Sequence, residues 1–206
     1  MPTRPNPNKL FTIYSKLDEK VLRICNAHHC FLIGGTALEI LMNSNHLKFN
    51  RKRSDNDFDF VMRISNSPHL KVIDRELCHL RDFTKTGDDR IMVNFNSDLV
   101  EVDILVTAEK IDQQDILTVG DYKIMSPAWM FTSKFSRYIS IDPRFNQEKF
   151  ESDRNDLLDL LSMINLSGGE EITRLEKLLG QVIDFEEKAV IKLQELVIQY
   201  NKSRLH

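Results

Sequence analysis

The chain has little cysteine, no long apolar run and no excess of basic residues. Its three cysteines are an odd number without the spacing of a disulfide framework, which predicts a reducing cytoplasm rather than an extracellular compartment. No apolar stretch approaches the roughly 18 residues that a membrane span needs. The first seven residues lack the apolar segment of a signal peptide. We therefore expect a cytoplasmic protein without membrane contact.

The formal net charge of −3 gives no overall basic signature of a nucleic-acid-binding protein. Charged residues make up 29% and apolar residues 41% of the chain, which is typical of a soluble globular protein. One local basic run, Arg51-Lys52-Arg53, precedes an acidic segment. This run is either a guide for a polyanionic substrate or an ordinary solvated loop, and the sequence leaves both open.

The segment Cys25-Asn26-Ala27-His28-His29-Cys30 has the residue types of a metal knuckle. Its ligands are crowded into six residues, however, and no second cluster in the sequence completes a tetrahedral site. We therefore interpret the segment as the end of a helix that runs into a buried strand, with both cysteines acting as small apolar residues.

The first part of the chain alternates between strand and helix patterns. Ser67 and Pro68 are good N-cap and N1 residues for a helix that ends near Leu80. The other predicted elements are helices over 10–25 and 36–42, strands over 31–33, 57–63, 90–95, 99–106 and 122–125, and a turn at 87–89. The strands over 90–95 and 99–106 should form a hairpin through Asn96-Ser97-Asp98.

From position 126 onward the sequence shows helical patterns without a convincing strand. The predicted helices cover 126–139, 147–164 and 172–200, the first starting at Ser126-Pro127 and the last bent at Gly180. The length suffices for one large domain or two small ones. We predict an α+β fold, in which an α/β core over 1–126 holds a mixed sheet flanked by helices and a helical bundle follows over 127–206.

The motif Gly34-Gly35-Thr36 lies between a predicted buried strand and a predicted helix. Glycine lets a phosphate group approach the backbone, and the first turn of a helix offers free N–H groups. A plain tight turn has the same sequence signature. The glycine pair alone therefore does not decide between a phosphate site and a turn.

Two carboxylates share one face of the strand predicted over 57–63. Side chains alternate along a strand, so Asp57 and Asp59 point the same way while Phe58 and Phe60 face the core. Carboxylates held side by side repel each other unless a cation lies between them. Such hard oxygen ligands suit Mg²⁺, which also binds nucleotide phosphates. The alternative is an ordinary solvated strand face.

Asp103 is a third carboxylate, in a strand that is otherwise apolar over 102–106. A carboxylate in such a strand is costly unless it has a partner or a metal ion. If this strand pairs beside the strand over 57–63, Asp57, Asp59 and Asp103 converge. Two cations could then be held in the manner of a two-metal phosphoryl-transfer site.

These residues together resemble the nucleotidyltransferase superfamily typified by polymerase beta, in which a glycine pair and a helix precede Asp-x-Asp and a third carboxylate. The chain looks most like the AbiEii-type toxin family of bacterial toxin–antitoxin systems. The segments that carry this resemblance are 31–38, Arg53 with 57–60, Ser126-Pro127 with Lys134, and 154–160. It covers about residues 25 to 165.

The resemblance implies a nucleotidyltransferase-like fold and a role for each matching residue. The triphosphate would be held by Gly34, Gly35 and Thr36. Metal binding and catalysis would fall to Asp57, Asp59 and Asp103. Lys134 would contact the phosphates, and Asp156 would orient that lysine or the nucleotide. The chain departs from the family pattern at Asp55, where a hydroxyl residue is common, and at Asn155, where a lysine is common.

We therefore expect a Mg²⁺-dependent enzyme that transfers an NMP from an NTP to an acceptor hydroxyl. The resemblance implies a toxin whose acceptor is tRNA, another RNA end or a protein side chain, and whose partner is an antitoxin protein. The alternative is a non-catalytic interaction module that binds a partner through its C-terminal helices. The sequence leaves open which NTP is used, which acceptor and antitoxin are involved, and the oligomeric state.

Overall fold

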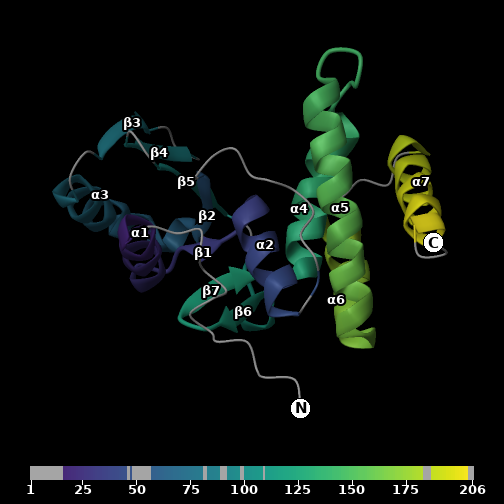
Figure 1. The fold of residues 1–206 in the computed structure, drawn as a ribbon, viewed down its shortest axis with the longest axis horizontal. Helices are drawn as coiled ribbons and strands as arrows, with labels where there is room; N and C mark the ends of the chain where they lie inside the picture. Colours follow the sequence, from purple (N-terminus) through teal and green to yellow (C-terminus); the bar gives the residue numbers. More distant parts are fainter. Residues whose placement is uncertain are drawn as a thin grey trace. The chain divides into compact units, whose positions relative to one another are not determined.

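The computed structural model describes residues 16–45, 47, 57–80, 83–88, 92–97, 100–108, 110–182 and 187–203. The chain divides into two compact units, Met1–Met125 and Ser126–His206. Figure 1 shows the strands in the first unit and helices α4 to α7 in the second. The basic run 51–53 and Asp55, which drew attention in the sequence, lie outside the described residues.

The first unit is built on a seven-stranded mixed sheet with the strand order β3-β4-β5-β2-β1-β7-β6. The strands are β1 Phe31–Leu32, β2 Asp57–Arg63, β3 Thr84–Asp88, β4 Met92–Asn96, β5 Glu101–Thr107, β6 Ile116–Val119 and β7 Tyr122–Met125. β2 is parallel to β5 and antiparallel to β1, while β4 and β5 form the predicted antiparallel hairpin. β2 therefore lies in the middle of the sheet, with a neighbour on each side.

One face of the central strands is fully apolar because every second residue points to it. Phe58 and Phe60 of β2 are buried, and their register partners on β5 are Val102 and Ile104. Phe95 of β4, opposite Val102, continues the same buried row. Burying these side chains contributes about 1.5 to 3 kcal/mol each. The opposite face of the same strands is therefore left for their polar residues.

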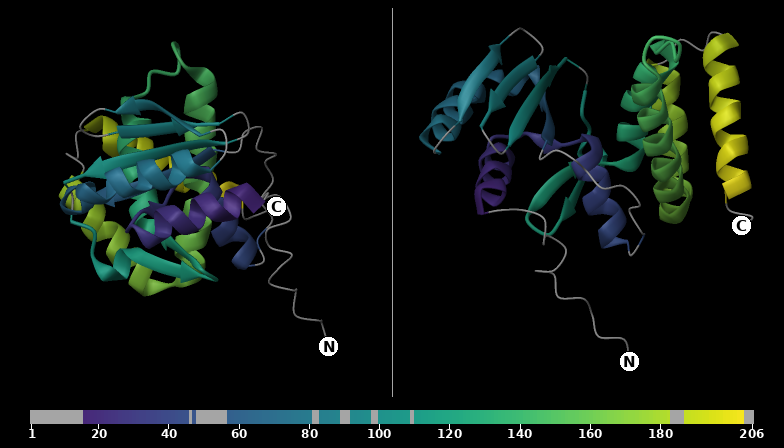
Figure 2. Two further views of the ribbon diagram at one scale, coloured as in Figure 1. Left: turned by 90° about the vertical axis from the view of Figure 1, so that its left-hand side faces the viewer. Right: turned by 45° about the horizontal axis from the view of Figure 1, so that its top comes forward.

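The helices of the first unit are α1 Lys16–Ala27, α2 Gly34–Ser44 and α3 Leu70–His79. α2 follows directly after β1 and packs on β2, as the buried run 36–42 of this helix indicates. α1 contacts β1 and β7. It also lies beside α3, and both views in Figure 2 show these two helices next to each other. The described part of the predicted first helix is thus confirmed, and its predicted start at 10–15 lies outside the described residues.

The second unit consists of α4 Pro127–Ser140, α5 Gln147–Ser167, α6 Gly169–Val182 and α7 Glu187–Ser203. Ser126 is the N-cap of α4, as predicted, and its side chain accepts a hydrogen bond from the Trp129 N–H. Aromatic rings fill the space between α4 and α5: the Tyr138 and Phe150 rings stack with centroids 4.7 Å apart. Pro127 at the first helical position favours this start because proline needs no N–H partner there.

The predicted helix start at Ser67-Pro68 is wrong. A 3₁₀ helix, η2, spans Ile64–His69 with Pro68 inside it, and α3 begins at Leu70 without a side-chain cap. Ser67 contributes its backbone carbonyl, which accepts from the Leu70 N–H. The chain turns at once after β2, and short 3₁₀ segments commonly form such connectors to an α-helix.

The turn predicted at 87–89 is also wrong for Gly87 and Asp88, which end strand β3. Gly87 pairs with Asn94 next to a register shift, and a Cβ at position 87 would lie 2.6 Å from Asn94 Oδ1. Glycine is needed here for close approach in an irregular pairing rather than for a turn. The sequence prediction also missed β6, which pairs with β7 across a turn where Gly120 has φ +59°.

In the helix predicted over 172–200, the bend at Gly180 is wrong. The structure has two helices there, α6 ending at Val182 and α7 starting at Glu187, and Gly180 lies inside α6 rather than at a bend. Both helices keep the predicted amphipathic pattern. Residues 183–186, between these two helices, lie outside the described residues.

Two smaller sequence interpretations can be compared with the structure. Cys25 and Cys30 are fully buried with their thiols in contact, and burial together with Cys30 raises the pKa of Cys25. A buried, protonated thiol is a poor metal ligand, so the interpretation as small apolar residues is confirmed. Among the described residues, no helix combines the length and the apolar character that crossing a membrane requires.

Candidate active site

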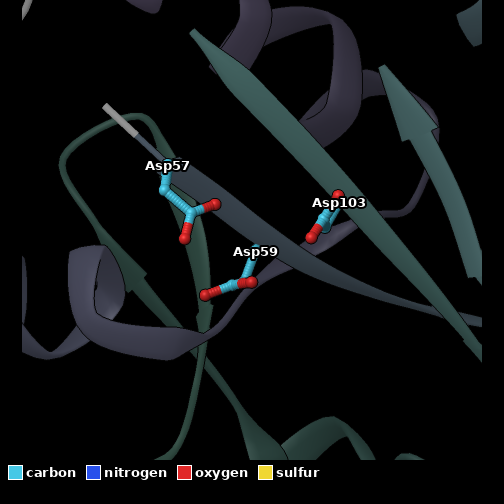
Figure 3. A group of neighbouring side chains, drawn as sticks. All are labelled: Asp57, Asp59 and Asp103. Atoms are coloured by element: carbon cyan, nitrogen blue, oxygen red, sulfur yellow. The ribbon is translucent and has the colours of Figure 1, made fainter. Parts of the chain in front are cut away.

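Three carboxylates from two neighbouring strands meet on the polar face of the sheet. Asp59 on β2 is the register partner of Asp103 on β5, and Asp57 lies two residues earlier on β2. Asp57, Asp59 and Asp103 each offer an oxygen, and these oxygens all lie within 4.8 Å of one another. Figure 3 shows Asp57 and Asp59 projecting from one strand and Asp103 turned toward them from the next. The parallel β2–β5 pairing therefore brings together the three acids that the sequence singled out.

Gly34 lies directly against this cluster. It has φ +72°, and a Cβ at this position would lie 2.0 Å from Asp59 Oδ2. The Asp59 backbone carbonyl also accepts from the Ile33 N–H at 2.8 Å. Both the left-handed backbone and the close carboxylate require glycine here. The start of α2, with its unpaired N–H groups and positive dipole end, is thereby held beside Asp59.

The other two residues of the glycine motif lie in the first turn of α2. Gly35 is partly exposed, whereas Thr36 is buried. The Thr36 hydroxyl donates a hydrogen bond to the Asp57 backbone carbonyl at 2.8 Å. Thr36 therefore fastens the helix start to the strand that carries the acids, a contact that the sequence argument did not foresee.

Asn94 is a site residue that sequence reasoning missed. It lies on β4 opposite Asp103, and its Nδ2 donates to Asp103 Oδ1 at 2.5 Å. Asn94, Asp103 and Asp59 thus form one row across β4, β5 and β2. The signal was present in the sequence, because Asn94 lies between Val93 and Phe95 at the polar position of an alternating strand.

The donor set of the cluster fits a hard divalent cation. Two carboxylate charges at the 4.8 Å limit of this cluster repel by about 3 kcal/mol at an effective dielectric constant of about 20. All three acids are only partly buried, so an ion has access to them. Clustered carboxylate oxygens are the ligands that Mg²⁺, Mn²⁺ and Ca²⁺ prefer. Such a cation would relieve the repulsion that the fold imposes.

A second charged cluster lies between α4 and α5 in the other unit. The Lys134 Nζ donates to Asp156 Oδ2 at 2.5 Å and lies 3.6 Å from Asp153 Oδ1. The Arg137 Nε and Nη2 donate to the two oxygens of Asp153 at 2.8 and 2.7 Å. The resemblance gave Asp156 the role of orienting Lys134 or the nucleotide, and in the structure Asp156 pairs with Lys134. Neighbouring Asn155 is exposed.

Asp153 is the residue of this second cluster that sequence reasoning missed. Its side chain has no exposed surface. Burial raises the pKa of Asp153, but the hydrogen bonds from Arg137 and the charge of Lys134 outweigh it and hold this pKa below its ordinary value. Asp153 precedes Leu157 and Leu160 at helical spacing on the buried face of α5. A carboxylate in an apolar stripe was the available signal.

Comparisons with known proteins give matches at the level of structure. Comparison of the sequence with protein families finds no match, and comparison with curated proteins finds none either. The structure is similar to that of the Megavirus polyadenylate synthase, with a TM-score of 0.54 and 17% identity over 78% of this chain. The chain spans about a third of that protein, 32% of its length.

The structure is also similar to the antibiotic-resistance factor ANT(2'')-Ia in solution, with a TM-score of 0.52 and 11% identity over 91% of this chain and 96% of that one. A crystal structure of ANT(2'')-Ia in complex with adenylyl-2''-tobramycin matches with a TM-score of 0.51 and 11% identity, over 81% of this chain and 97% of that one. At such low identity these matches speak for the fold. The chain has the predicted nucleotidyltransferase-like α+β fold, and the closer resemblance to AbiEii-type toxins stays a prediction.

Proposed function

We propose that this protein is a divalent-metal-dependent nucleotidyltransferase that moves an NMP from an NTP to an acceptor hydroxyl. The observation that carries the proposal is the convergence of Asp57, Asp59 and Asp103 within 4.8 Å beside the start of α2. The nucleotidyltransferase-like fold supports the proposal, because the three carboxylates lie on the fold that the sequence pattern predicted.

Each residue of the cluster has a role that follows from its position. Asp57 and Asp59 hold the cation, which we take to be Mg²⁺ and which, when bound, supplies positive charge for the triphosphate and the attacking oxygen. Asp103 completes the ligand set and accepts the proton of the acceptor hydroxyl. Asn94 keeps the Asp103 carboxylate oriented through its hydrogen bond. The N–H groups of Gly35 and Thr36 face the phosphates at the helix start.

We assign phosphate contacts to Lys134 on the basis of the sequence resemblance, with Asp156 orienting it. The 2.5 Å contact between Lys134 and Asp156 supports the orienting role. Arg137 supports the same arrangement indirectly, because it neutralises buried Asp153 beside Lys134. A lysine ammonium acts on phosphate as a point charge, so its main contribution is to NTP affinity.

The acceptor we propose is an RNA end, tRNA included, or a protein side chain, with the enzyme acting as the toxin of a toxin–antitoxin pair. This part rests on the sequence resemblance. The structural neighbours carry different acceptors in their names, a polyadenylate synthase and an enzyme bound to adenylyl-2''-tobramycin. An acceptor test therefore needs three arms: total RNA, protein extract and an aminoglycoside.

The experiment is labelled-nucleotide transfer, with each of the four NTPs, by the unmodified chain and by Asp57→Asn and Asp59→Asn. Both variants keep the side-chain size and remove a charged ligand. We expect each to lose at least about 100-fold in transfer activity, because an electrostatic contribution to the transition state is removed. Asp121→Asn is the matched control, since Asp121 is exposed in the β6–β7 turn. Full activity in both site variants with Mg²⁺ present would overturn the assignment.

A specific observation also supports the alternative, a non-catalytic interaction module. Helix α7 leaves Val190, Ile191, Val197 and Ile198 exposed, at 38%, 47%, 41% and 54% of their surface. Exposed apolar side chains gathered on one helix are typical of partner binding, and an antitoxin is the partner that the resemblance implies. Mg²⁺-dependent NTP binding separates the two functions, because an interaction module has no reason to show it.

A further inference from the structure

Three histidines lie where the end of α1 meets α3, outside the acidic cluster of β2 and β5. His28 and His29 follow the last residue of α1, and His69 precedes the first residue of α3. His29 has φ +62°, a left-handed conformation that is uncommon for a residue other than glycine. This turn is closed by the Cys30 N–H, which donates to the Cys25 carbonyl at 3.0 Å.

The rings of His28 and His69 approach each other through the same type of nitrogen. Their Nδ1 atoms lie 3.4 Å apart, and both side chains are only partly buried. Two nitrogens bound to one tetrahedral zinc ion, with bonds of about 2.05 Å, lie about 3.3 Å apart. The two nitrogens therefore have the spacing of a pair of metal ligands.

Glu76 on α3 decides which nitrogen of His28 carries the proton. The His28 Nε2 lies 3.2 Å from Glu76 Oε2. An ionised carboxylate accepts hydrogen bonds only, so the Nε2 of neutral His28 is the N–H donor and its Nδ1 carries a lone pair. A carboxylate that holds the far nitrogen of a ligating histidine is the usual outer partner in metal sites.

We propose that His28 and His69 bind a divalent d-block cation, with Zn²⁺ as the type case, through their Nδ1 atoms, with Glu76 as the outer partner. The ion joins the end of α1 to the start of α3, and water completes its coordination. Imidazole nitrogens suit Zn²⁺, Ni²⁺ and Cu²⁺, whereas the carboxylates of the acidic cluster suit harder ions. The proposal is independent of the nucleotidyltransferase function, because it uses none of the residues assigned there.

The test is calorimetric titration of Zn²⁺ into the full chain carrying Asp57→Asn and Asp59→Asn, so that the acidic cluster does not compete. We expect His28→Gln and His69→Gln, added to this background, to weaken Zn²⁺ binding at least tenfold each. Glu76→Gln should weaken it about tenfold. The control is His79→Gln, since His79 is an exposed histidine at the other end of α3. Equal Zn²⁺ affinity in the His28, His69 and His79 variants would overturn the proposal.

A second measurement needs no substitution and covers the case in which a variant fails to fold. Long-range ¹H–¹⁵N spectra of the histidine rings in the unmodified chain report coordination directly. We expect one equivalent of Zn²⁺ to shift the Nδ1 signals of His28 and His69 while the His79 signals stay in place. Unchanged Nδ1 signals at saturating Zn²⁺ would show that the 3.4 Å approach is a hydrogen bond between two neutral rings and would overturn the proposal.

Discussion

At the scale of single residues, Gly34 links the backbone of α2 to the acidic cluster. Its φ of +72° suits glycine, and Asp59 occupies the space that any side chain would need. The sequence argument placed phosphate approach at the glycine pair as a whole. The two glycines have different surroundings in the structure. Gly34 lies against the Asp59 carboxylate, whereas Gly35 lies in the first turn of the helix.

Replacing Gly34 by alanine therefore tests both constraints at once. A left-handed alanine costs about 1 to 2 kcal/mol, and the methyl group must also displace Asp59. Gly120→Ala is the matched control, because Gly120 has φ +59° with open space around its Cβ position. We expect Gly34→Ala to lose at least about 1 kcal/mol more unfolding free energy than Gly120→Ala in urea titrations. Equal losses would contradict the close contact with Asp59.

Asn94 offers a second test at this scale. Asn94→Asp replaces the donor to Asp103 by a fourth carboxylate, at nearly unchanged size. We expect the melting temperature without metal to fall, because a new carboxylate repulsion is added beside Asp103 and the hydrogen bond to it is lost. Added Mg²⁺ should restore part of the loss, which differential scanning calorimetry can follow. An identical loss with and without Mg²⁺ would argue against a cation at this cluster.

The candidate site could be predicted from sequence to the extent that its signals were local. Asp57 and Asp59 share a face by the alternation of one strand, and Asp103 was conspicuous among apolar neighbours. Asn94 and Asp153 were missed because their importance depends on a partner on another element, Asp103 on β5 in one case and Arg137 on α4 in the other. Such pairings are set by register and helix packing rather than by local pattern.

At the scale of elements, the parallel pairing of β2 with β5 builds the site. The register that places Asp59 beside Asp103 also places Phe58 beside Val102 on the buried face. A slip of one residue would bury the acids and expose the aromatic side chains, so the core holds the acids in place. The acidic cluster is therefore a consequence of the same pairing that stabilises the sheet.

The α4–α5 contact carries a pH-dependent prediction. The pKa of Asp153 is held below its ordinary value, so its stabilising effect is present above about pH 4 and is lost as pH falls through the lowered folded pKa. Asp153→Asn should lose about 1.5 to 3 kcal/mol at neutral pH, because the half-exposed Arg137 loses its charge-assisted hydrogen bonds to Asp153 but remains in contact with water. Denaturant unfolding from pH 7 to 3 should then give a flatter profile than the unmodified chain. A parallel profile would contradict the ion pair.

Element boundaries were predictable where a turn or a cap had a distinctive residue. Ser126-Pro127 marked the start of α4, whereas Gly87 misled, because a glycine required by close strand approach looks like one required by a turn. Local pattern thus identified the type of most elements better than their ends.

At the scale of the whole molecule, structure comparison finds proteins with a similar fold, whereas sequence comparison finds no match. Sequence comparison finds no related family, yet the structural matches reach TM-scores of 0.54 and 0.52 at 17% and 11% identity. Many apolar sequences can fill one sheet core, so identity falls while the strand arrangement stays. What distinguishes a functional site on such a scaffold is the chemistry of its polar residues.

The most direct test of the central claim is the thermal stability of the unmodified chain, Asp59→Asn and Asp103→Asn, each with and without Mg²⁺ and a non-hydrolysable NTP. We predict that the unmodified chain melts higher with Mg²⁺ and nucleotide, by several degrees at saturation, because ligands that bind the folded state stabilise it. Each variant should melt at the same or a higher temperature without ligand, since a repulsion is removed, and should gain little from Mg²⁺ and nucleotide. A ligand-dependent rise in both variants equal to that of the unmodified chain would contradict the claim that these carboxylates hold the metal and the nucleotide.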